Sequence, residues 1–244
     1  MALKLDILAI AAHPDDVELG CAGTMMAEKR NGKKIAILDL TRGELGTRGT
    51  PEKRLQEAKD ASAIMGLDAR ENADLADGFF ENSRRDQLKV IHYIRKYCPD
   101  IILANAPEDR HPDHGRAAQL IRDAAWLSGL RKIETYLDGE LQAAWRPSYV
   151  FHFVQDRYLK PDFVYDITAT MDDKVKCIRA FTSQFDTRED DEPQTYISSP
   201  AFLHSVVERA KAYGKIIGVP YAEGFITDKT LGISSFDEVV LNAT

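Results

Sequence analysis

The chain has 244 residues, of which 44% are hydrophobic, and its formal net charge is −7 at pH 7. This length and composition suffice for one domain spanning residues 1–244, with a core that needs no disulfides. The acidic balance argues against a nucleic-acid or anionic-membrane surface, since phosphate binding relies on clustered Lys and Arg. The three cysteines are widely spaced, and no apolar run approaches the roughly 18 residues of a membrane span. We therefore expect a cytoplasmic protein that acts on small molecules.

Strand-like apolar runs and helix-like amphipathic runs alternate over the first half of the chain. Strands are expected at residues 5–12, 34–41, 72–76 and 101–105. Helices are expected at residues 17–31, 51–65, 83–98 and from 115 onward. A carboxylate at Asp15 or Asp16 is expected to cap the first helix, and Gly66 to end the second. This order predicts an α/β fold with a Rossmann-like, mainly parallel sheet, helices on both faces and an active site at the carboxyl ends of the strands.

The second half of the chain is less regular. Strands are expected at residues 149–154 and 163–167, and helices at residues 172–184 and 201–217. Two long irregular segments, residues 41–51 and 185–200, are expected to be exposed loops, and either could cover a site.

Two His-Pro-Asp clusters follow two of the expected strands. His13-Pro14-Asp15-Asp16 comes after residues 5–12, and His111-Pro112-Asp113-His114 comes after residues 101–105. If both strands belong to one parallel sheet, the loops at their carboxyl ends converge. His13, Asp16 and His114 then supply three ligands and leave a position open, as a hydrolytic zinc ion requires. The same donor set can also bind iron, cobalt or nickel.

A simpler interpretation exists for each cluster, since a His-Pro-Asp turn after a strand can serve only to cap the next helix. The presence of two such clusters favours the metal site. Asp15 is then the candidate general base, with helix capping as its alternative role. A protonated His111 could stabilise an oxyanion. Asp113 could orient the His111 ring, or it could cap the helix expected to begin at Gly115.

Arginines gather near the same edge of the expected sheet. Arg42, Arg48, Arg54 and Arg110 lie in or just after the loops that end the first strands, in a chain that is acidic elsewhere. Arginine binds carboxylate and phosphate bidentately, so the group suggests an anionic substrate. For Arg42 and Arg48, a surface ion pair is the simpler interpretation.

Both clusters lie in longer segments that resemble one known family. Residues 12–24, AHPDDVELGCAGT, and residues 108–118, EDRHPDHGRAA, resemble the LmbE-like, or PIG-L, zinc-dependent N-acetylglucosamine deacetylases. Residues 38–58, 160–167 and 218–225 resemble the bacillithiol-biosynthesis branch of that family. That branch converts N-acetylglucosaminyl-malate to glucosaminyl-malate and acetate.

The resemblance implies roles for individual residues. It makes His13, Asp16 and His114 the metal ligands, Asp15 the base and His111 the histidine beside the oxyanion, in agreement with the assignment above. It also implies a set of substrate contacts, at Arg54, Arg110, Tyr196, Glu44 and Asp77. Relatives often assemble into rings, so the resemblance further implies a homo-oligomer. The chain departs from the more widespread motif by having Val17, and only then Glu18, after the aspartate pair.

The sequence therefore predicts a zinc-dependent deacetylase of N-acetylglucosaminyl-malate, with Fe²⁺ as another candidate metal. An amidase of glucosamine-thiol S-conjugates and a chitooligosaccharide deacetylase are alternatives within the hydrolases. A non-catalytic, metal-binding Rossmann-like module is the alternative outside them.

Overall fold

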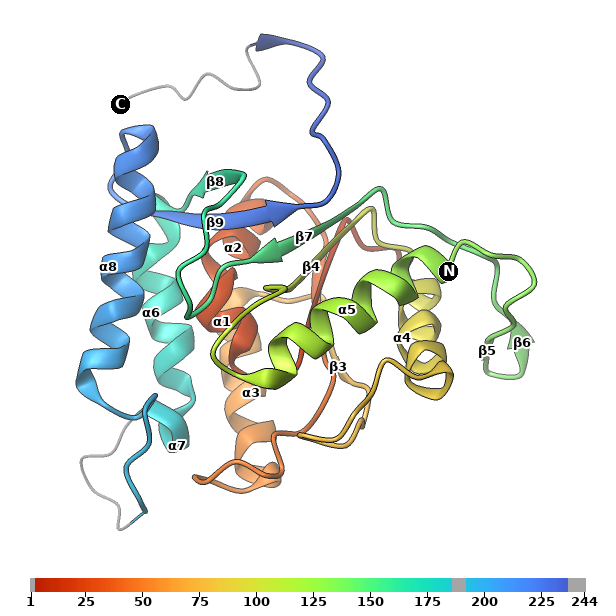
Figure 1. Ribbon diagram of the computed structural model, residues 1–244, viewed down its shortest axis with the longest axis horizontal. Coiled ribbons are helices and arrows are strands. Elements are labelled where there is room, and N and C mark those ends of the chain that lie inside the picture. Colours follow the sequence, from red (N-terminus) through yellow and green to blue (C-terminus); the bar gives the residue numbers. More distant parts are fainter. Residues whose placement is uncertain (1–2, 186–191, 237–244) are drawn as a thin grey trace.

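A sheet of seven strands organises the computed structural model, which describes residues 3–185 and 192–236 (Figure 1). Its strand order is β3-β2-β1-β4-β7-β9-β8. The strands are β1 (Ile7–Ala11), β2 (Ile35–Asp39), β3 (Ala69–Asn72), β4 (Ile101–Asn105), β7 (Tyr149–Phe153), β8 (Phe163–Asp166) and β9 (Ala222–Thr227). A separate hairpin joins β5 (Tyr136–Leu137) and β6 (Glu140–Leu141).

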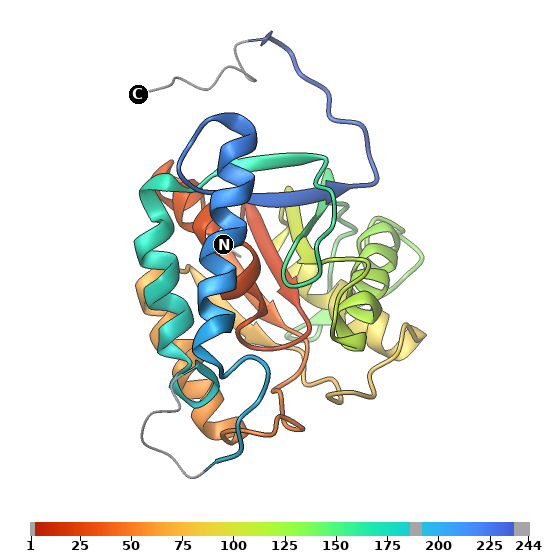
Figure 2. The same ribbon diagram turned by 60° about the vertical axis from the view of Figure 1, so that its left-hand side comes forward.

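Helices cover both faces of the sheet (Figure 2). They are α1 (Asp16–Gly20), α2 (Ala22–Arg30), α3 (Pro51–Met65), α4 (Arg84–Tyr97), α5 (Pro112–Leu127), α6 (Met171–Ala180), α7 (Thr182–Phe185) and α8 (Pro200–Ile217), with a short 3₁₀ turn η1 (Thr168–Thr170). None of the helices in the described part of the chain is long and apolar enough to cross a membrane.

The central strands are parallel, as the alternating pattern predicts. β1 lies between β2 and β4 and pairs in parallel with both, and β4 pairs in parallel with β7. Alternate residues of β1 enter two cores: Leu8 and Ile10 pack with α4 and α5, while Ile7 and Ala9 pack with α1, α2 and α6. This burial on both faces explains the continuous apolar runs. The predicted α/β fold class is confirmed.

The helix expected at residues 17–31 is instead two helices. The chain breaks at Cys21, whose φ of −145° and ψ of 16° lie outside the helical range. A buried ion pair from distant segments stabilises the break: Lys174 donates to the Leu19 carbonyl, and Glu223 accepts from the backbone N–H groups of Gly23 and Thr24. These partners satisfy helix-end groups that a continuous helix would have paired internally.

Other boundaries differ for local reasons. The third strand occupies residues 69–72 rather than 72–76, and α5 begins at Pro112 rather than at Gly115. The ring of His111 accepts from the backbone N–H of Asp113 and so caps α5, which makes the capping role considered for Asp113 wrong. The helix expected at residues 172–184 is divided between α6 and α7.

The sequence analysis did not anticipate β9. It inserts antiparallel between β7 and β8, so the sheet is mixed at this edge. The short run Ala222–Thr227 carries a glutamate and a glycine and shows no clear period-two pattern. Its strand conformation depends on its two neighbours in the sheet rather than on its own propensity.

Candidate metal centre and active site

The two His-Pro-Asp clusters meet at the carboxyl ends of β1 and β4. Asp16 Oδ1 lies 3.1 Å from His114 Nε2, and Asp16 Oδ2 lies 3.5 Å from His13 Nδ1. All three side chains are buried. Because β1 and β4 are parallel neighbours, the loops that follow them emerge side by side, as the sequence analysis expected.

Histidine and aspartate side chains form a candidate metal site here. Among the described residues, ligand atoms of His13, His111 and His114 lie within 4.8 Å of one another, as do those of His13, Asp77 and Asp113. Asp16 belongs to neither of these sets, although it contacts both His13 and His114. Imidazole and carboxylate donors together suit zinc and other borderline divalent ions, so the residues present fit the metal that the family resemblance implies.

Asp109 fixes the orientation of His114. The Nδ1 atom of His114 lies 2.6 Å from Asp109 Oδ2, so with the ring proton on Nδ1 the Nε2 atom faces Asp16. Metal-binding histidines usually donate their other ring N–H to a carboxylate in this manner. The sequence analysis missed Asp109. Its only signal was its position at the start of the loop that carries the second cluster.

His13 is held by two other carboxylates. Its Nε2 atom lies 3.0 Å from Asp77 Oδ1 and 3.3 Å from Asp113 Oδ2. Asp113 was expected to orient His111, but its carboxylate lies against His13 because Gly78 N–H and Arg116 also bind it there. Asp77, expected to contact substrate, likewise orients His13.

The charges of the three candidate ligands are strongly coupled. Burial alone would lower the pKa of His13, but hydrogen bonds to the surrounding carboxylates raise it well above its ordinary value. Burial would also lower the pKa of His114, but the charge of Asp16 and the bond to Asp109 raise it to about 9. Burial would raise the pKa of Asp16, yet the charge and hydrogen bond of His114 hold it well below its usual range. Without a metal, protons on the histidines therefore balance the carboxylates.

Asp15 has an unusual backbone and a shifted pKa. Its φ of 111° lies in the left-handed region that non-glycine residues rarely adopt, which is typical of constrained functional positions. Asp15 was considered as a helix cap, but its Oδ2 instead lies 3.1 Å from Arg54 Nη2. Burial raises the pKa of Asp15 to about 7, against the opposing charge of Arg54. Arg54, expected to contact substrate, thus lies against the candidate base.

His111 differs from expectation in its charge. Burial and the neighbouring positive rings of His13 and His114 lower the pKa of His111, so the ring is neutral rather than protonated. Its Nδ1 atom accepts from the backbone N–H of Asp113 at 3.2 Å, which leaves the ring proton on Nε2. A neutral His111 can therefore still donate a hydrogen bond.

These residues surround one cavity of about 350 Å³, called the site cavity below. Of the eleven residues expected at the site, nine line it, and Asp113 and Glu44 do not. The carboxylate of Glu44 accepts from the backbone N–H groups of Asp77 and Arg42, so it connects two loops.

Arg110 and Tyr196 meet over a carboxylate at the edge of the site cavity. Arg110 Nε lies 2.8 Å from Asp156 Oδ2, and the Tyr196 hydroxyl donates to Asp156 Oδ1 at 3.2 Å. The Arg110 guanidinium lies 4.5 Å from the centre of the Tyr196 ring, within cation–π range. Asp156 was not anticipated.

The remaining two arginines do not present a free cation to the site cavity. Arg42 is exposed and forms an ion pair with Asp74 at 2.6 Å, as the simpler interpretation expected. Arg48 also has an ion pair, with Glu192 at 4.0 Å, but its side chain is 1% exposed rather than at the surface and donates to the carbonyl groups of Ser183, Glu192 and Pro193.

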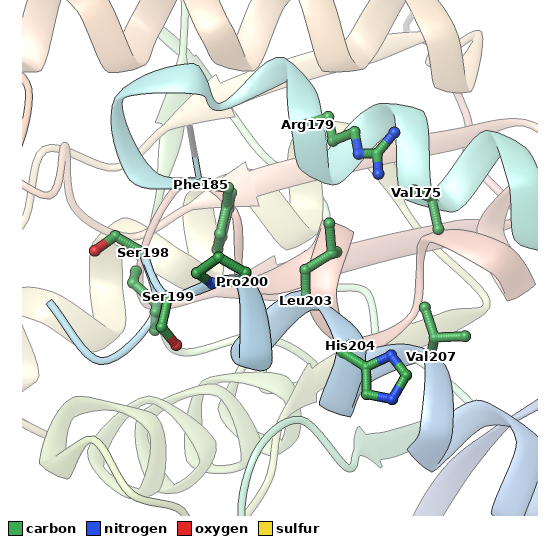
Figure 3. Close-up of a pocket in the computed structure, with 10 residues that line it drawn as sticks. Val175, Arg179, Phe185, Ser198, Ser199, Pro200, Leu203, His204 and Val207 are labelled. Carbon is green, nitrogen blue, oxygen red and sulfur yellow. The ribbon is translucent and has the colours of Figure 1, made fainter. Parts of the chain in front are cut away.

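A second and larger cavity, of about 580 Å³, lies between α6 and α8. Figure 3 shows Val175 and Arg179 on α6 across from Leu203, His204 and Val207 on α8. Of the described residues, its lining contributes one histidine and no carboxylate. Among the residues that the structure describes, this α6–α8 cavity therefore offers no set of metal-binding side chains.

The chain is similar to known proteins in both sequence and fold. The family model described as PIG-L, GlcNAc-PI de-N-acetylase, matches residues 8–125, which include both clusters. The conserved protein TT1542 from Thermus thermophilus is 36% identical in sequence, with a TM-score of 0.83, and the match covers 94% of this chain and 98% of that one. Over residues 8–125 the chain is therefore similar to the PIG-L family.

Two similar proteins have named activities. The diacetylchitobiose deacetylase of Thermococcus kodakarensis is 29% identical over 96% of this chain and 88% of its own length. The N,N'-diacetylchitobiose deacetylase of Pyrococcus horikoshii has a TM-score of 0.76 and is 26% identical, over 96% of this chain and 88% of that one. These relatives are hydrolases that remove acetyl groups.

Proposed function

We propose that this protein is a metal-dependent deacetylase that hydrolyses the acetamide of an N-acetylglucosamine-type substrate. One observation carries the proposal: His13, Asp16 and His114 meet in a single cavity that Asp15 also lines. A metal-binding set beside a buried carboxylate that can accept a proton is a combination suited to amide hydrolysis.

The chain's own residues have distinct tasks in this reaction. His13, Asp16 and His114 would hold the ion, with zinc as the first candidate and Fe²⁺ as the second. When bound, such an ion acts as a Lewis acid that polarises a carbonyl and lowers the pKa of water. Asp15 takes a proton from the attacking water and later delivers it to the departing amine. The Nε2–H of His111 donates to the oxygen that becomes negative in the transition state.

We further propose N-acetylglucosaminyl-malate as the substrate. The support is the resemblance of residues 38–58, 160–167 and 218–225 to the bacillithiol branch. Arg110 adds a physical reason, since its side chain is 46% exposed and lines the site cavity. Its guanidinium can therefore bind a malate carboxylate bidentately.

A chitooligosaccharide is the second candidate substrate. It is favoured by the names of the two deacetylases described above, both of which match almost the whole chain. A second sugar ring has no charge, so this substrate would not need Arg110.

Acetate release from N-acetylglucosaminyl-malate and from diacetylchitobiose separates the two candidates. The malate substrate predicts a higher kcat/KM for the first compound and a raised KM for it in Arg110→Met. The matched control is Arg42→Met, because Arg42 is an exposed arginine paired with an aspartate but does not line the site cavity. A higher kcat/KM for diacetylchitobiose, with no effect of Arg110→Met, would favour the second candidate. Metal binding without acetate release from any acetamido sugar would favour a non-catalytic module.

A further inference from the structure

Two amide side chains that the sequence analysis did not single out hold Asp16 in place. Gln155 Nε2 donates to Asp16 Oδ1 at 2.7 Å, and Asn105 Nδ2 donates to Asp16 Oδ2 at 3.1 Å. Asn105 ends β4, and Gln155 follows β7, the next strand of the sheet. The carboxylate of Asp16 therefore lies between groups from three neighbouring strand ends.

The two oxygens of Asp16 are not equally available. Oδ2 accepts from Asn105 Nδ2 and also from the backbone N–H of His13 at 3.0 Å, which uses both of its lone pairs. Oδ1 accepts from Gln155, and its remaining side faces His114 Nε2 at 3.1 Å. Oδ2 also lies 3.5 Å from His13 Nδ1, but of the two oxygens only Oδ1 keeps a lone pair that no amide or backbone donor of the described residues occupies.

Asn105 is itself held rigidly. Asn105 is fully buried, and its side-chain Oδ1 accepts from the backbone N–H of Ala12 at 2.8 Å. Its backbone carbonyl accepts from His152 Nδ1 at 2.7 Å. Its amide group therefore cannot rotate without losing a buried hydrogen bond, which is costly. Gln155 Oε1 lies 3.4 Å from Asn105 Nδ2, so the two amides also contact each other.

We infer that Asn105 and Gln155 are positioning residues that make Asp16 a one-oxygen metal ligand through Oδ1. This inference rests on the proposed metal-dependent function. By occupying Oδ2, Asn105 and the backbone N–H of His13 prevent the carboxylate from binding an ion through both oxygens, while Gln155 fixes the direction of Oδ1. A one-oxygen ligand uses a single coordination position and leaves room for water and substrate, as catalytic sites require.

The inference is tested by the affinity of the protein for Zn²⁺ alone, measured by competition with a chromogenic chelator. Gln155→Met keeps the length of the side chain and removes the donor to Asp16 Oδ1. Gln184→Met is the matched control, because Gln155 and Gln184 are both 5% exposed and line the same cavity, but Gln184 donates to Arg48 and Ser183. We expect Gln155→Met to raise the Kd for Zn²⁺ about 10- to 100-fold, the usual effect of losing a partner of a metal ligand.

The thermal midpoint of the metal-free protein distinguishes positioning from general stability. For Gln155→Met we expect a midpoint close to that of Gln184→Met, despite the large difference in Kd. Asn105→Ser provides a second variant; it should also raise the Kd at least tenfold, with a lower midpoint because Ala12 loses a partner. The inference is overturned if both Asp16-contacting variants bind Zn²⁺ within twofold of wild type, or if Gln184→Met weakens binding equally. The measurement of Zn²⁺ affinity uses no substrate. Failure to release acetate in a separate assay would therefore contradict the proposed function and leave the measured Zn²⁺ affinities unchanged.

Discussion

The site cavity and the α6–α8 cavity differ in the kinds of side chain that line them. The α6–α8 cavity is the larger, at about 580 Å³ against about 350 Å³ for the site cavity. The described residues of its walls are mainly apolar and come from α6, α7, α8 and the segment before α8. The site cavity is lined by side chains that follow several strand ends. Asp16 and Asp77 lie against His13, Asp15 lies against Arg54, and Asp156 lies against Arg110.

The contrast shows that convergence of charged groups, rather than volume, identifies the site. The loops that follow parallel strands lie at the same edge of the sheet, so their side chains converge. Helices packed side by side contribute only the side chains along their facing surfaces. Substitutions in the two cavities should therefore have very different effects on metal binding and turnover.

The largest difference is expected between two histidines. His114→Ala should lose bound metal and, with it, several kcal/mol of transition-state stabilisation, on the order of 10³-fold in turnover. His204→Ala removes an exposed histidine of the α6–α8 cavity and should leave metal content unchanged. Metal analysis and acetate release measure both effects. Equal losses in the two variants would contradict the assignment of the site.

Asp15→Asn separates chemistry from metal binding. The variant keeps the size of the side chain and removes the base, so turnover should fall by about 10²- to 10⁴-fold while metal content stays near that of wild type. The measurement is single-substrate kinetics on metal-analysed protein. Unimpaired turnover would remove Asp15 from the mechanism.

Asp109→Asn should weaken metal binding without abolishing it. Asp109 Oδ2 lies 2.6 Å from His114 Nδ1, and loss of its charge should lower the affinity for Zn²⁺ about 10- to 100-fold. Asp156→Asn is the control, since Asp156 contacts Arg110 and Tyr196 at the edge of the site cavity. The account fails at this point if the two variants have the same Kd for Zn²⁺.

Metal affinity should rise with pH. The pKa of His13 is raised well above its ordinary value and that of His114 to about 9, so in the metal-free protein both rings are protonated at neutral pH. A cation must displace these protons, so the Kd for Zn²⁺ should fall as the pH is raised through neutrality towards about 9, the pKa of His114. Calorimetry in buffers with different protonation enthalpies would detect the released protons, and an affinity that is independent of pH would contradict the charge balance described above.

The smallest effect is expected in the α6–α8 cavity. Leu203→Ala removes a half-buried side chain that packs against the cluster of Leu19, Ile178, Phe202 and Val206. It should lower the free energy of unfolding by about 0.5–3 kcal/mol while kcat/KM stays within twofold of wild type. A tenfold loss of kcat/KM in a variant that is fully folded would show that the two cavities act together.

Much of this site could be predicted because sequence patterns report strand ends. The apolar runs before His13 and His111 located the two loops, and parallel pairing of β1 with β4 then brought His13, Asp16 and His114 together. The confirmed fold class depends on the same regular alternation. The features that the sequence predicts correctly therefore lie within short segments, and they depend on the regular alternation of strands and helices.

Other features depend on contacts that sequence spacing does not reveal. Asn105 and Gln155 carry no motif, and their role appears only when β4 and β7 lie next to each other. The charge of His111 depends on the rings around it, and the strand β9 depends on its neighbours. Part of the segment expected to be a loop at residues 185–200 lies outside the described residues.

Removal and return of the metal tests the central claim most directly. Acetate release from N-acetylglucosaminyl-malate and diacetylchitobiose would be measured before chelation, after removal of the chelator, and after stepwise addition of Zn²⁺ or Fe²⁺. We expect activity on at least one substrate to disappear with the metal and to return fully at about one equivalent of ion per chain, as one three-ligand site requires. Acetate release that persists at the original rate in metal-free protein would contradict the account.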